Sequence, residues 1–186
     1  MNRLAPVLSQ VQRPRRRSTG VLAAILTLLV LSACTKTTTV VLVRHAEPDL
    51  IPVNDPPLSA AGVLRAQALV EVMRQARLAA VFHTQFARTT QTAEIVATAL
   101  GVPRIQIDVT PGQEQQHADS VGARILDGFA GRNVLVVGHS NTIDRIATAL
   151  GVPNAPSIGS QEFGNLLAVI RRASDNSVLV HGRYGQ

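Results

Sequence analysis

Two histidines and two arginines are the residues of this chain whose types and positions could carry chemistry. Arg44 and His45 begin the segment Arg-His-Ala-Glu, Arg88 lies in the segment 84–93, and His139 lies in a Gly-His-Ser segment. A neutral imidazole can attack phosphorus, and an unperturbed histidine is largely neutral at pH 7. Guanidinium groups stay charged and can bind phosphate oxygens in pairs, so these four residue types are compatible with phosphoryl chemistry.

The predicted strands place these four residues at one edge of a sheet. Strands over 39–43, 79–83 and 134–137 lead into the segments that hold His45, Arg88 and His139. The strand at 134–137 is the most apolar, as expected for a parallel strand covered on both faces. In an open α/β sheet, ligands bind outside the carboxyl ends of the strands, so we expect the four side chains to share one pocket.

An alternation of strands and helices predicts an α/β fold. Ser59 is the predicted N-cap of a helix that runs to about Arg77. The apolar stripe of this helix is predicted to be Leu64, Ala68, Leu69, Val72 and Met73. Further helices are predicted from about residue 88, over 120–130 and over 143–150, and further strands over 104–109, 166–170 and 178–181. The last two strands flank a Ser-Asp-Asn turn at 174–176 and should form a hairpin.

The positive charge of the chain comes mostly from its first 34 residues. The chain has 186 residues, with 18 basic and 12 acidic side chains. Five arginines and no acidic residue precede residue 35, which leaves 13 basic against 12 acidic residues in the rest of the chain. This nearly neutral body is also poor in aromatic residues, so it does not predict nucleic-acid binding.

The first 34 residues resemble the signal peptide of a bacterial lipoprotein. A basic stretch at 13–17 precedes an apolar run of 11 residues, 21–31, that only Thr27 interrupts and that is too short to span a bilayer. The run leads into Leu-Ser-Ala-Cys, and Cys34 is the only cysteine of the chain. The resemblance implies cleavage before Cys34 and a lipid on its sulfur. An ordinary secretory signal, an uncleaved anchor and, less well supported, a twin-arginine signal are the alternatives.

This interpretation divides the chain into three parts. Residues 1–33 would be the signal peptide, residues 34–38 a short tether, and residues 39–186 a single domain. The protein would then be exported and lipid-anchored to a membrane of a bacterial cell envelope, with its domain outside the cytoplasm.

The candidate pocket segments resemble those of the histidine phosphatase superfamily, also called phosphoglycerate mutase-like. The segment 44–47 resembles the family's Arg-His-Gly signature, with Ala46 where glycine is usual. The segment 84–93 resembles the part that places an arginine at the start of the second helix, and 138–141 resembles the second-histidine motif. The stretch 55–62 resembles the sequence before the family's first long helix.

The resemblance implies both a fold and a mechanism. The fold would be a three-layer α/β/α sandwich around a mixed six-stranded sheet with one antiparallel strand. Its first and fourth strands would be adjacent at the centre and bring His45 beside His139. His45 would form a phosphohistidine that water hydrolyses, and Arg44, Arg88 and His139 would bind the phosphate.

The proton donor for the leaving group is left open by the sequence. Glu114, His117 and Asp119 all lie in the predicted loop after the third strand, and no spacing singles out one of them. Some members of the family lack this acid altogether. Glu47 follows the first signature, and we expect it to orient Arg44 or the neighbouring loop.

We expect neither a metal ion nor a cofactor. The chain has five histidines, but it has no His-x-x-x-His pair, no cysteine after Cys34 and no clustered carboxylates. His83 is expected to be a partly buried residue of the pocket wall, and His181 a surface residue.

The leading interpretation is therefore a metal-independent phosphatase that acts on phosphomonoesters. The alternatives are a phosphoglycerate-type mutase and a non-catalytic lipoprotein that binds a phosphorylated ligand. The partner would be a phosphorylated small molecule or a phosphoprotein. Because the sequence holds no inserted cap domain, we expect an open pocket, and sugar phosphates, nucleotides, phosphohistidine proteins and polyphosphate all remain possible substrates.

Overall fold

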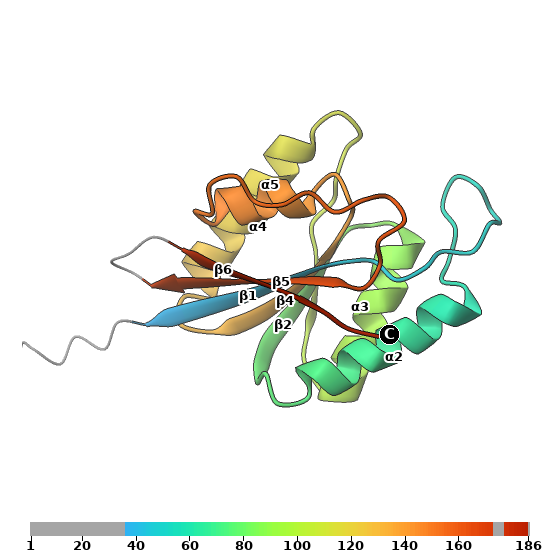
Figure 1. Cartoon of the computed structure of the whole chain (residues 1–186), viewed down its shortest axis with the longest axis horizontal. Helices are drawn as coiled ribbons and strands as arrows, with labels where there is room; N and C mark the ends of the chain where they lie inside the picture. The colour runs from blue at the N-terminus through green and yellow to red at the C-terminus, as the bar shows by residue number, and fades with distance from the viewer. Residues whose placement is uncertain (1–35, 173–176, 186) are drawn as a thin grey trace, which may run out of the picture. The chain divides into compact units, whose positions relative to one another are not determined.

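A six-stranded sheet with two helices on each face makes up the part of the chain that the structure describes (Figure 1). This computed structural model describes residues 36–172 and 177–185. The predicted signal peptide and Cys34 lie outside these residues. In the described part, none of the helices is both long enough and apolar enough to cross a membrane.

The sheet is mixed, with the strand order β3-β2-β4-β1-β5-β6. The strands are β1 (Thr37–Arg44), β2 (Leu78–His83), β3 (Arg104–Gln106), β4 (Asn133–Gly138), β5 (Asn165–Arg172) and β6 (Val178–Arg183). Among these strands, β5 alone runs opposite to the other five, whereas β1 and β4 are parallel to each other and central. The predicted sheet and C-terminal hairpin are confirmed, and the predicted turn at 174–176 lies outside the described residues.

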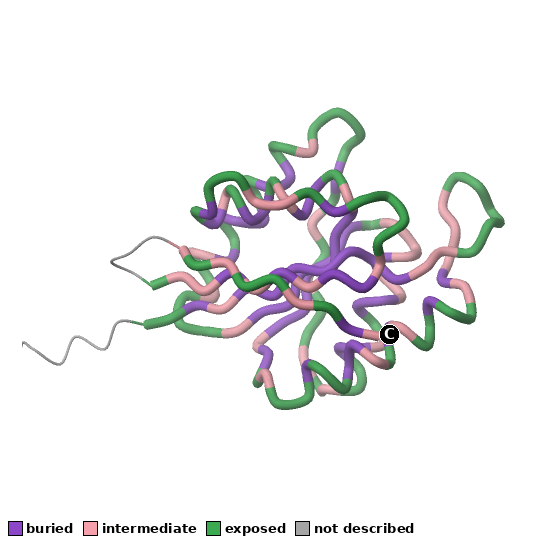
Figure 2. Tube along the Cα trace, viewed as in Figure 1, coloured by how far each residue is buried: buried purple, intermediate pink, exposed green. Residues whose placement is uncertain are grey.

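Four helices cover the two faces of this sheet. They are α2 (Ala60–Met73), α3 (Ala87–Leu100), α4 (Glu114–Gly128) and α5 (Ile143–Ala149). Alternate residues of a strand point to opposite faces. Val41 and Val43 of β1 therefore pack with α2 and α3, whereas Val40 and Leu42 pack with α4 and α5. Figure 2 shows the resulting buried residues concentrated along the strands and on the inner sides of the helices.

The structure corrects the apolar face predicted for the first helix. Ser59 caps α2 as predicted, because its hydroxyl accepts a hydrogen bond from the Gly62 amide at 3.1 Å. However, the buried residues of α2 are Gly62, Ala66, Leu69, Val70 and Met73. Leu64 is 67% exposed. A Cβ at Gly62 would lie only 2.2 Å from the carbonyl oxygen of Glu47. This close approach places the Gly62 side of α2 against the domain, so the buried face of the helix differs from the predicted apolar stripe.

Several predicted boundaries also shift, and α2 ends at Met73 rather than near Arg77. β1 begins at Thr37, so the last two residues of the predicted tether pair with β5. The third strand ends at Gln106, three residues before its predicted end. α4 begins at Glu114, six residues before its predicted start, because His117 and Ala118 are buried and hold the added turn against the domain.

Candidate active site

The pairing of β1 with β4 brings the two candidate histidines together. Arg44 pairs with Gly138, so His45 and His139 follow at adjacent strand ends. The His45 amide donates a hydrogen bond to the Gly138 carbonyl at 2.9 Å. The two imidazole rings are buried, with centroids 5.4 Å apart and planes 62° apart.

The backbone fixes the tautomer of His45. Its Nδ1 lies 2.8 Å from the carbonyl oxygen of Ala46, which can only accept, so Nδ1 carries the proton. Nε2 therefore holds the lone pair, and it has no hydrogen-bond partner among the described residues. Burial is the main cause that lowers the pKa of His45, to about 3. His45 is therefore a neutral imidazole at pH 7, with an unpaired ring nitrogen.

A chain of hydroxyl groups orients His139. The Thr89 hydroxyl donates to the carbonyl of Phe86 at 2.8 Å and lies 2.7 Å from the hydroxyl of Thr84. Since the single proton of Thr89 is used, Thr84 donates to Thr89 and accepts from Nε2 of His139, at 2.9 Å. Burial first, and then the charges of neighbouring groups, lower the pKa of His139 to about 3. His139 is thus neutral in the free site, and a bound dianion would favour its protonation.

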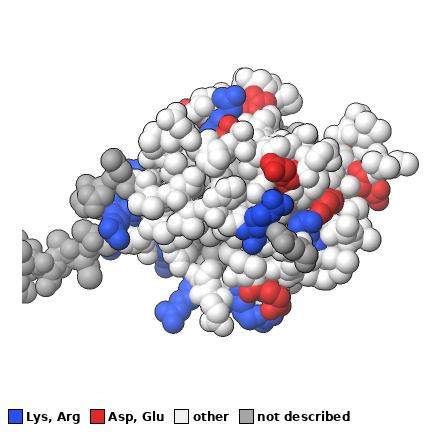
Figure 3. All heavy atoms as spheres, viewed as in Figure 1, with Lys and Arg blue, Asp and Glu red and all other residues white. Residues whose placement is uncertain are grey.

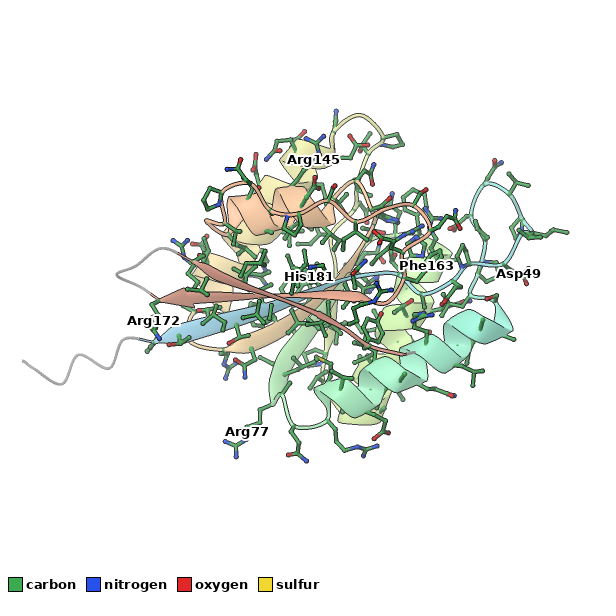
Figure 4. The ribbon with its side chains drawn as sticks, in the orientation of Figure 1. Asp49, Arg77, Arg145, Phe163, Arg172 and His181 are labelled. Atoms are coloured by element: carbon green, nitrogen blue, oxygen red, sulfur yellow. The ribbon has the colours of Figure 1, made fainter. Side chains whose placement is uncertain are left out.

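Arg44 is held from two sides by a segment far along the chain. Its guanidinium carbon lies 4.1 Å from the ring centroid of Phe163, and Nη1 donates to the Gly159 carbonyl at 3.1 Å. Its Nε is buried and has no partner among the described groups. Burial and the charge of Arg88 lower the pKa of Arg44. In the side-chain view, Phe163 lies at the end of the sheet where the residue-48–58 loop begins (Figure 4).

Arg88 lies in the first turn of α3 beside the second histidine. Its guanidinium carbon is 4.7 Å from the ring centroid of Phe86, which in turn packs edge to face on His139 at 5.3 Å. Asp55 lies 3.7 Å from Nη1 of Arg88 and accepts a hydrogen bond from the Ala87 amide at 2.8 Å. Asp55 therefore ties the loop before α2 to the start of α3 and holds Arg88 near the histidines.

The four candidate residues line one cavity of about 580 Å³. Its other walls come from the loop that contains Pro48 and Val53, from the segment 109–114 and from residues 140–141. The cavity lies at the carboxyl ends of β1, β2 and β4, where the sequence placed the pocket.

Of the three candidate proton donors, the structure brings Glu114 to this cavity. Its carboxylate accepts hydrogen bonds from the Gly112 amide at 3.1 Å and from the Asn141 side chain at 3.2 Å. Backbone hydrogen bonds lower its pKa. His117 is buried against the Asp108 carbonyl, and Asp119 is exposed, so neither lines the cavity. All three lie in α4, which corrects the predicted loop.

The remaining polar candidates take structural positions. Glu47 forms an ion pair with Arg65 at 2.6 Å, so its partner is not Arg44, and its carbonyl accepts from the Ser59 amide at 3.0 Å. His83 is buried with Nδ1 2.7 Å from the Thr84 carbonyl, and His181 is exposed. Within residues 36–172 and 177–185, no group of three His, Cys, Asp or Glu side chains could hold a metal ion.

Sequence reasoning missed several residues that shape this site. Thr84 and Phe86 lie in the segment 84–93, which was singled out because it contains Arg88. Their closeness to Arg88 in the sequence could have indicated that they belong to the site. Asp55 likewise lay in a recognised stretch. Phe163 and the carbonyl of Gly159 had no local signal, because they reach Arg44 through the path of the chain between α5 and β5.

Comparisons with known proteins agree with this geometry. Residues 40–114 match the model of the histidine phosphatase superfamily (branch 1), a match that includes Arg44, His45, Arg88 and Glu114. No curated protein matches the sequence significantly.

Solved structures share the fold at low sequence identity. The protein histidine phosphatase SixA, solved with tungstate, has a TM-score of 0.62 and 20% identity over 78% of this chain and 96% of its own. A structure described as mycobacterial hydrolase 2 has a TM-score of 0.63 and 16% identity over 81% of this chain and 92% of its own. YhfR of Bacillus stearothermophilus has a TM-score of 0.58 and 20% identity over 73% of this chain and 95% of its own. The described residues of this chain, with a mixed six-stranded sheet and four helices, therefore have the phosphoglycerate mutase-like fold of these structures, and residues 40–114 are similar to the histidine phosphatase superfamily.

Proposed function

We propose that this protein is a phosphatase that hydrolyses phosphomonoesters through a phosphohistidine on His45. The observation that carries the proposal is the state of the His45 ring. Its Nδ1 donates to a backbone carbonyl, its Nε2 is unpaired, and its lowered pKa keeps the ring neutral. A neutral imidazole beside two guanidinium groups in one cavity is suited to attack on a phosphate ester.

In the first step, the lone pair of His45 Nε2 forms a bond to phosphorus, and the bond from phosphorus to the leaving oxygen breaks. Arg44 and Arg88 bind the equatorial oxygens, whose charge they stabilise in the transition state. His139 becomes protonated as the dianion binds, and it then adds a further donor to the same oxygens. The fixed packing of Arg44 on Phe163 and of Arg88 on Phe86 supports this arrangement.

Glu114 is the proposed proton carrier at this cavity. Protonated, it donates to the leaving oxygen. Ionised, it then accepts a proton from the water that attacks the phosphohistidine and releases inorganic phosphate from Nε2. Its lowered pKa leaves it ionised in the free site, so it must take up a proton when the substrate dianion binds, or act on leaving groups that need little protonation.

The substrate is proposed to be a phosphorylated small molecule or a phosphoprotein. SixA is described as a protein histidine phosphatase, and another structure of this fold as a mycobacterial glucosyl-3-phosphoglycerate phosphatase. The fold therefore accommodates both kinds of phosphorylated compound. The cavity of this chain opens beside the exposed loop around Val53, which leaves space for a bulky phosphorylated group.

We also propose that the protein is exported and anchored by a lipid on Cys34. The support is the sequence of residues 13–34, in which a basic stretch, an apolar run and the lipobox, the segment Leu-Ser-Ala-Cys that ends at Cys34, follow in order. Residues 1–33 would be removed, and the domain that begins near Thr37 would follow a short connection.

The proposed phosphatase activity needs no metal ion, because the arginines supply the positive charge that a metal ion would otherwise provide.

A substrate screen on the processed protein tests the proposed activity. The panel should contain p-nitrophenyl phosphate, sugar phosphates, nucleotides, a phosphohistidine peptide and polyphosphate, with release of inorganic phosphate as the readout. Turnover of at least one compound that His45→Ala abolishes is the expected result. Binding of phosphorylated compounds without turnover would favour the non-catalytic alternative.

A further inference from the structure

Four basic residues lie at the end of the sheet opposite the cavity, where the proposed catalysis does not use them. Arg77 directly precedes β2, Arg132 precedes β4, Lys36 precedes β1, and Arg172 is the last residue of β5. Because β5 is antiparallel, its carboxyl end lies at the amino ends of the other three strands. We name these four residues the basic row.

The strand register makes neighbours of the first two members. Leu78 pairs with Asn133, so Arg77 and Arg132, each one residue earlier, lie side by side. Both line a hollow of about 370 Å³ at this end of the sheet. Arg77 has a φ of 49°, the left-handed region that non-glycine residues rarely adopt.

The other two members continue the row across β1 and β5. Thr37 pairs with Arg172, so Lys36 lies next to Arg172 at the strand end. A Cβ on Gly131 would lie 2.9 Å from the Cβ of Lys36, which joins Lys36 to the turn that carries Arg132. Adjacent strands are about 4.8 Å apart, so four strand ends spread the row over about 14 Å.

The charges of the basic row are available to a ligand. All four residues are exposed, and none forms an ion pair with a carboxylate in the described part of the chain. At the same end, Glu71 pairs with Arg74 at 2.5 Å, and Asp127 lies in the last turn of α4. Asp175 lies outside the described residues.

The figures show this separation of charge within the domain. In Figure 4, Arg77 and Arg172 lie at the end of the sheet away from Asp49 and Phe163. In Figure 3, basic side chains at that end stand without acidic ones beside them in view, whereas over the other half of the domain basic and acidic side chains lie side by side. The small net charge of the body therefore hides a strongly basic end.

We propose that the basic row docks on the anionic phospholipid headgroups of a membrane surface. Headgroup phosphates offer a plane of negative charge that a row of cations at a sheet end can contact simultaneously. The sequence immediately before Lys36 holds an apolar run and the lipobox cysteine, so the chain enters the domain at this end. The row contains no aromatic residue on which nucleic-acid bases could stack.

This docking has a consequence for the direction of the cavity. β1 has eight residues and so spans about 26 Å between the basic row and the cavity at its carboxyl end. A domain that rests on headgroups through the row directs the cavity away from the bilayer. Its substrates then arrive from the aqueous side rather than from the lipids beneath it.

Vesicle flotation with a fragment of residues 35–186 tests the proposal without the leader or Cys34. These residues form a single compact unit, and SixA, matched over 96% of its own chain, is a solved protein with this fold. The fragment should float with phosphatidylglycerol vesicles at low salt, should be released by 0.5 M salt, and should not float with phosphatidylcholine vesicles. Failure here leaves the proposed catalysis and lipidation intact, because neither depends on the basic row.

Charge-removing variants assign the binding to the row. Arg77→Asn, Arg132→Gln and Arg172→Gln should each weaken binding about fivefold, and the triple variant about a hundredfold. Asparagine tolerates the left-handed conformation at position 77, and circular dichroism reports whether each variant is folded. Arg183→Gln, at an exposed site at the other end of the sheet, is the matched control and should bind like the parent fragment.

Three results would overturn the proposal. The first is equal binding to both kinds of vesicle, and the second is a folded triple variant that binds as well as the parent. The third is tighter binding to duplex DNA or RNA than to phosphatidylglycerol at the same salt concentration, which would assign the row to nucleic acid.

Discussion

The imidazole rings of His45 and His139 meet edge to face, with centroids 5.4 Å apart, although they come from different strands. Each has a pKa lowered to about 3, chiefly by burial, and the charge of His45 is among the causes for His139. Their hydrogen bonds differ, however. His45 is bonded through Nδ1 to its own backbone and keeps Nε2 unpaired, whereas His139 is bonded through Nε2 to Thr84. This difference supports the proposed role of His45 as the nucleophile.

His45→Ala should remove the phosphoenzyme and nearly all turnover, because the attacking nitrogen is lost. His139→Ala should retain a labelled intermediate and turn over slowly. Rapid quenching with labelled substrate measures both, since a phosphohistidine is labile to acid and stable to base. A label that survives in His45→Ala and disappears in His139→Ala would show that the two roles are reversed.

Arg88→Ala should lower the rate by about 10²–10³-fold, because it removes fixed donors to the transition state while the nucleophile remains. Arg88→Lys should recover part of this loss, since an ammonium keeps the charge but not the planar pair of donors. Steady-state kinetics with one substrate measure both variants. Arg183→Ala, at an exposed position on β6, is the matched control. An equal loss of rate in this variant would contradict the proposed role of Arg88 in the transition state.

The free energy of unfolding should fall as the pH is lowered from about 6.5 to about 3. His45 and His139 have an ordinary pKa of 6.5 when unfolded and about 3 when folded. Between these values the unfolded chain binds more protons, so acid favours unfolding, and the stabilisation is complete only above the unfolded pKa. Urea unfolding at pH 7 and pH 5 measures the difference. A double variant, His45→Gln with His139→Gln, should lose less stability between these pH values than the parent, and an equal loss would contradict the assignment.

Phosphatase activity should survive EDTA. Arg44 and Arg88 would neutralise the phosphate oxygens, so no metal ion is needed for this charge. Dialysis against EDTA followed by an assay checks the prediction. Loss of activity that zinc or magnesium restores would rule out the proposed mechanism.

Cys34→Ala should release the protein from the membrane fraction or leave it as the longer precursor. The predicted processing needs the sulfur of Cys34 for the lipid and places the cut before that residue. Intact-mass analysis of the mature protein measures both the new N-terminus and the added lipid. An unmodified Cys34 inside a longer mature chain would contradict the prediction.

The sequence by itself determined the strand ends and the residues that they carry. Apolar, β-branched runs around residues 40 and 135 identified β1 and β4, and Arg44, His45 and His139 follow directly from them. Ligand sites of α/β sheets lie at the carboxyl ends of the strands, so the location of the cavity could be predicted from local patterns. The α5 residues Ile143 and Ile146 were likewise predictable, because a strong apolar period fixes which face is buried.

Only the tertiary structure decided which side chains complete the site. Glu114 lines the cavity because α4 begins at this residue. The first turn of α4 is stabilised by the burial of His117 and Ala118 against the rest of the domain. Phe163 reaches Arg44 through contacts between segments more than a hundred residues apart in the chain. The basic row arises in the same way, because the sheet order aligns four strand ends that are scattered in sequence. Such contacts depend on the packing of whole elements, which local sequence patterns do not encode.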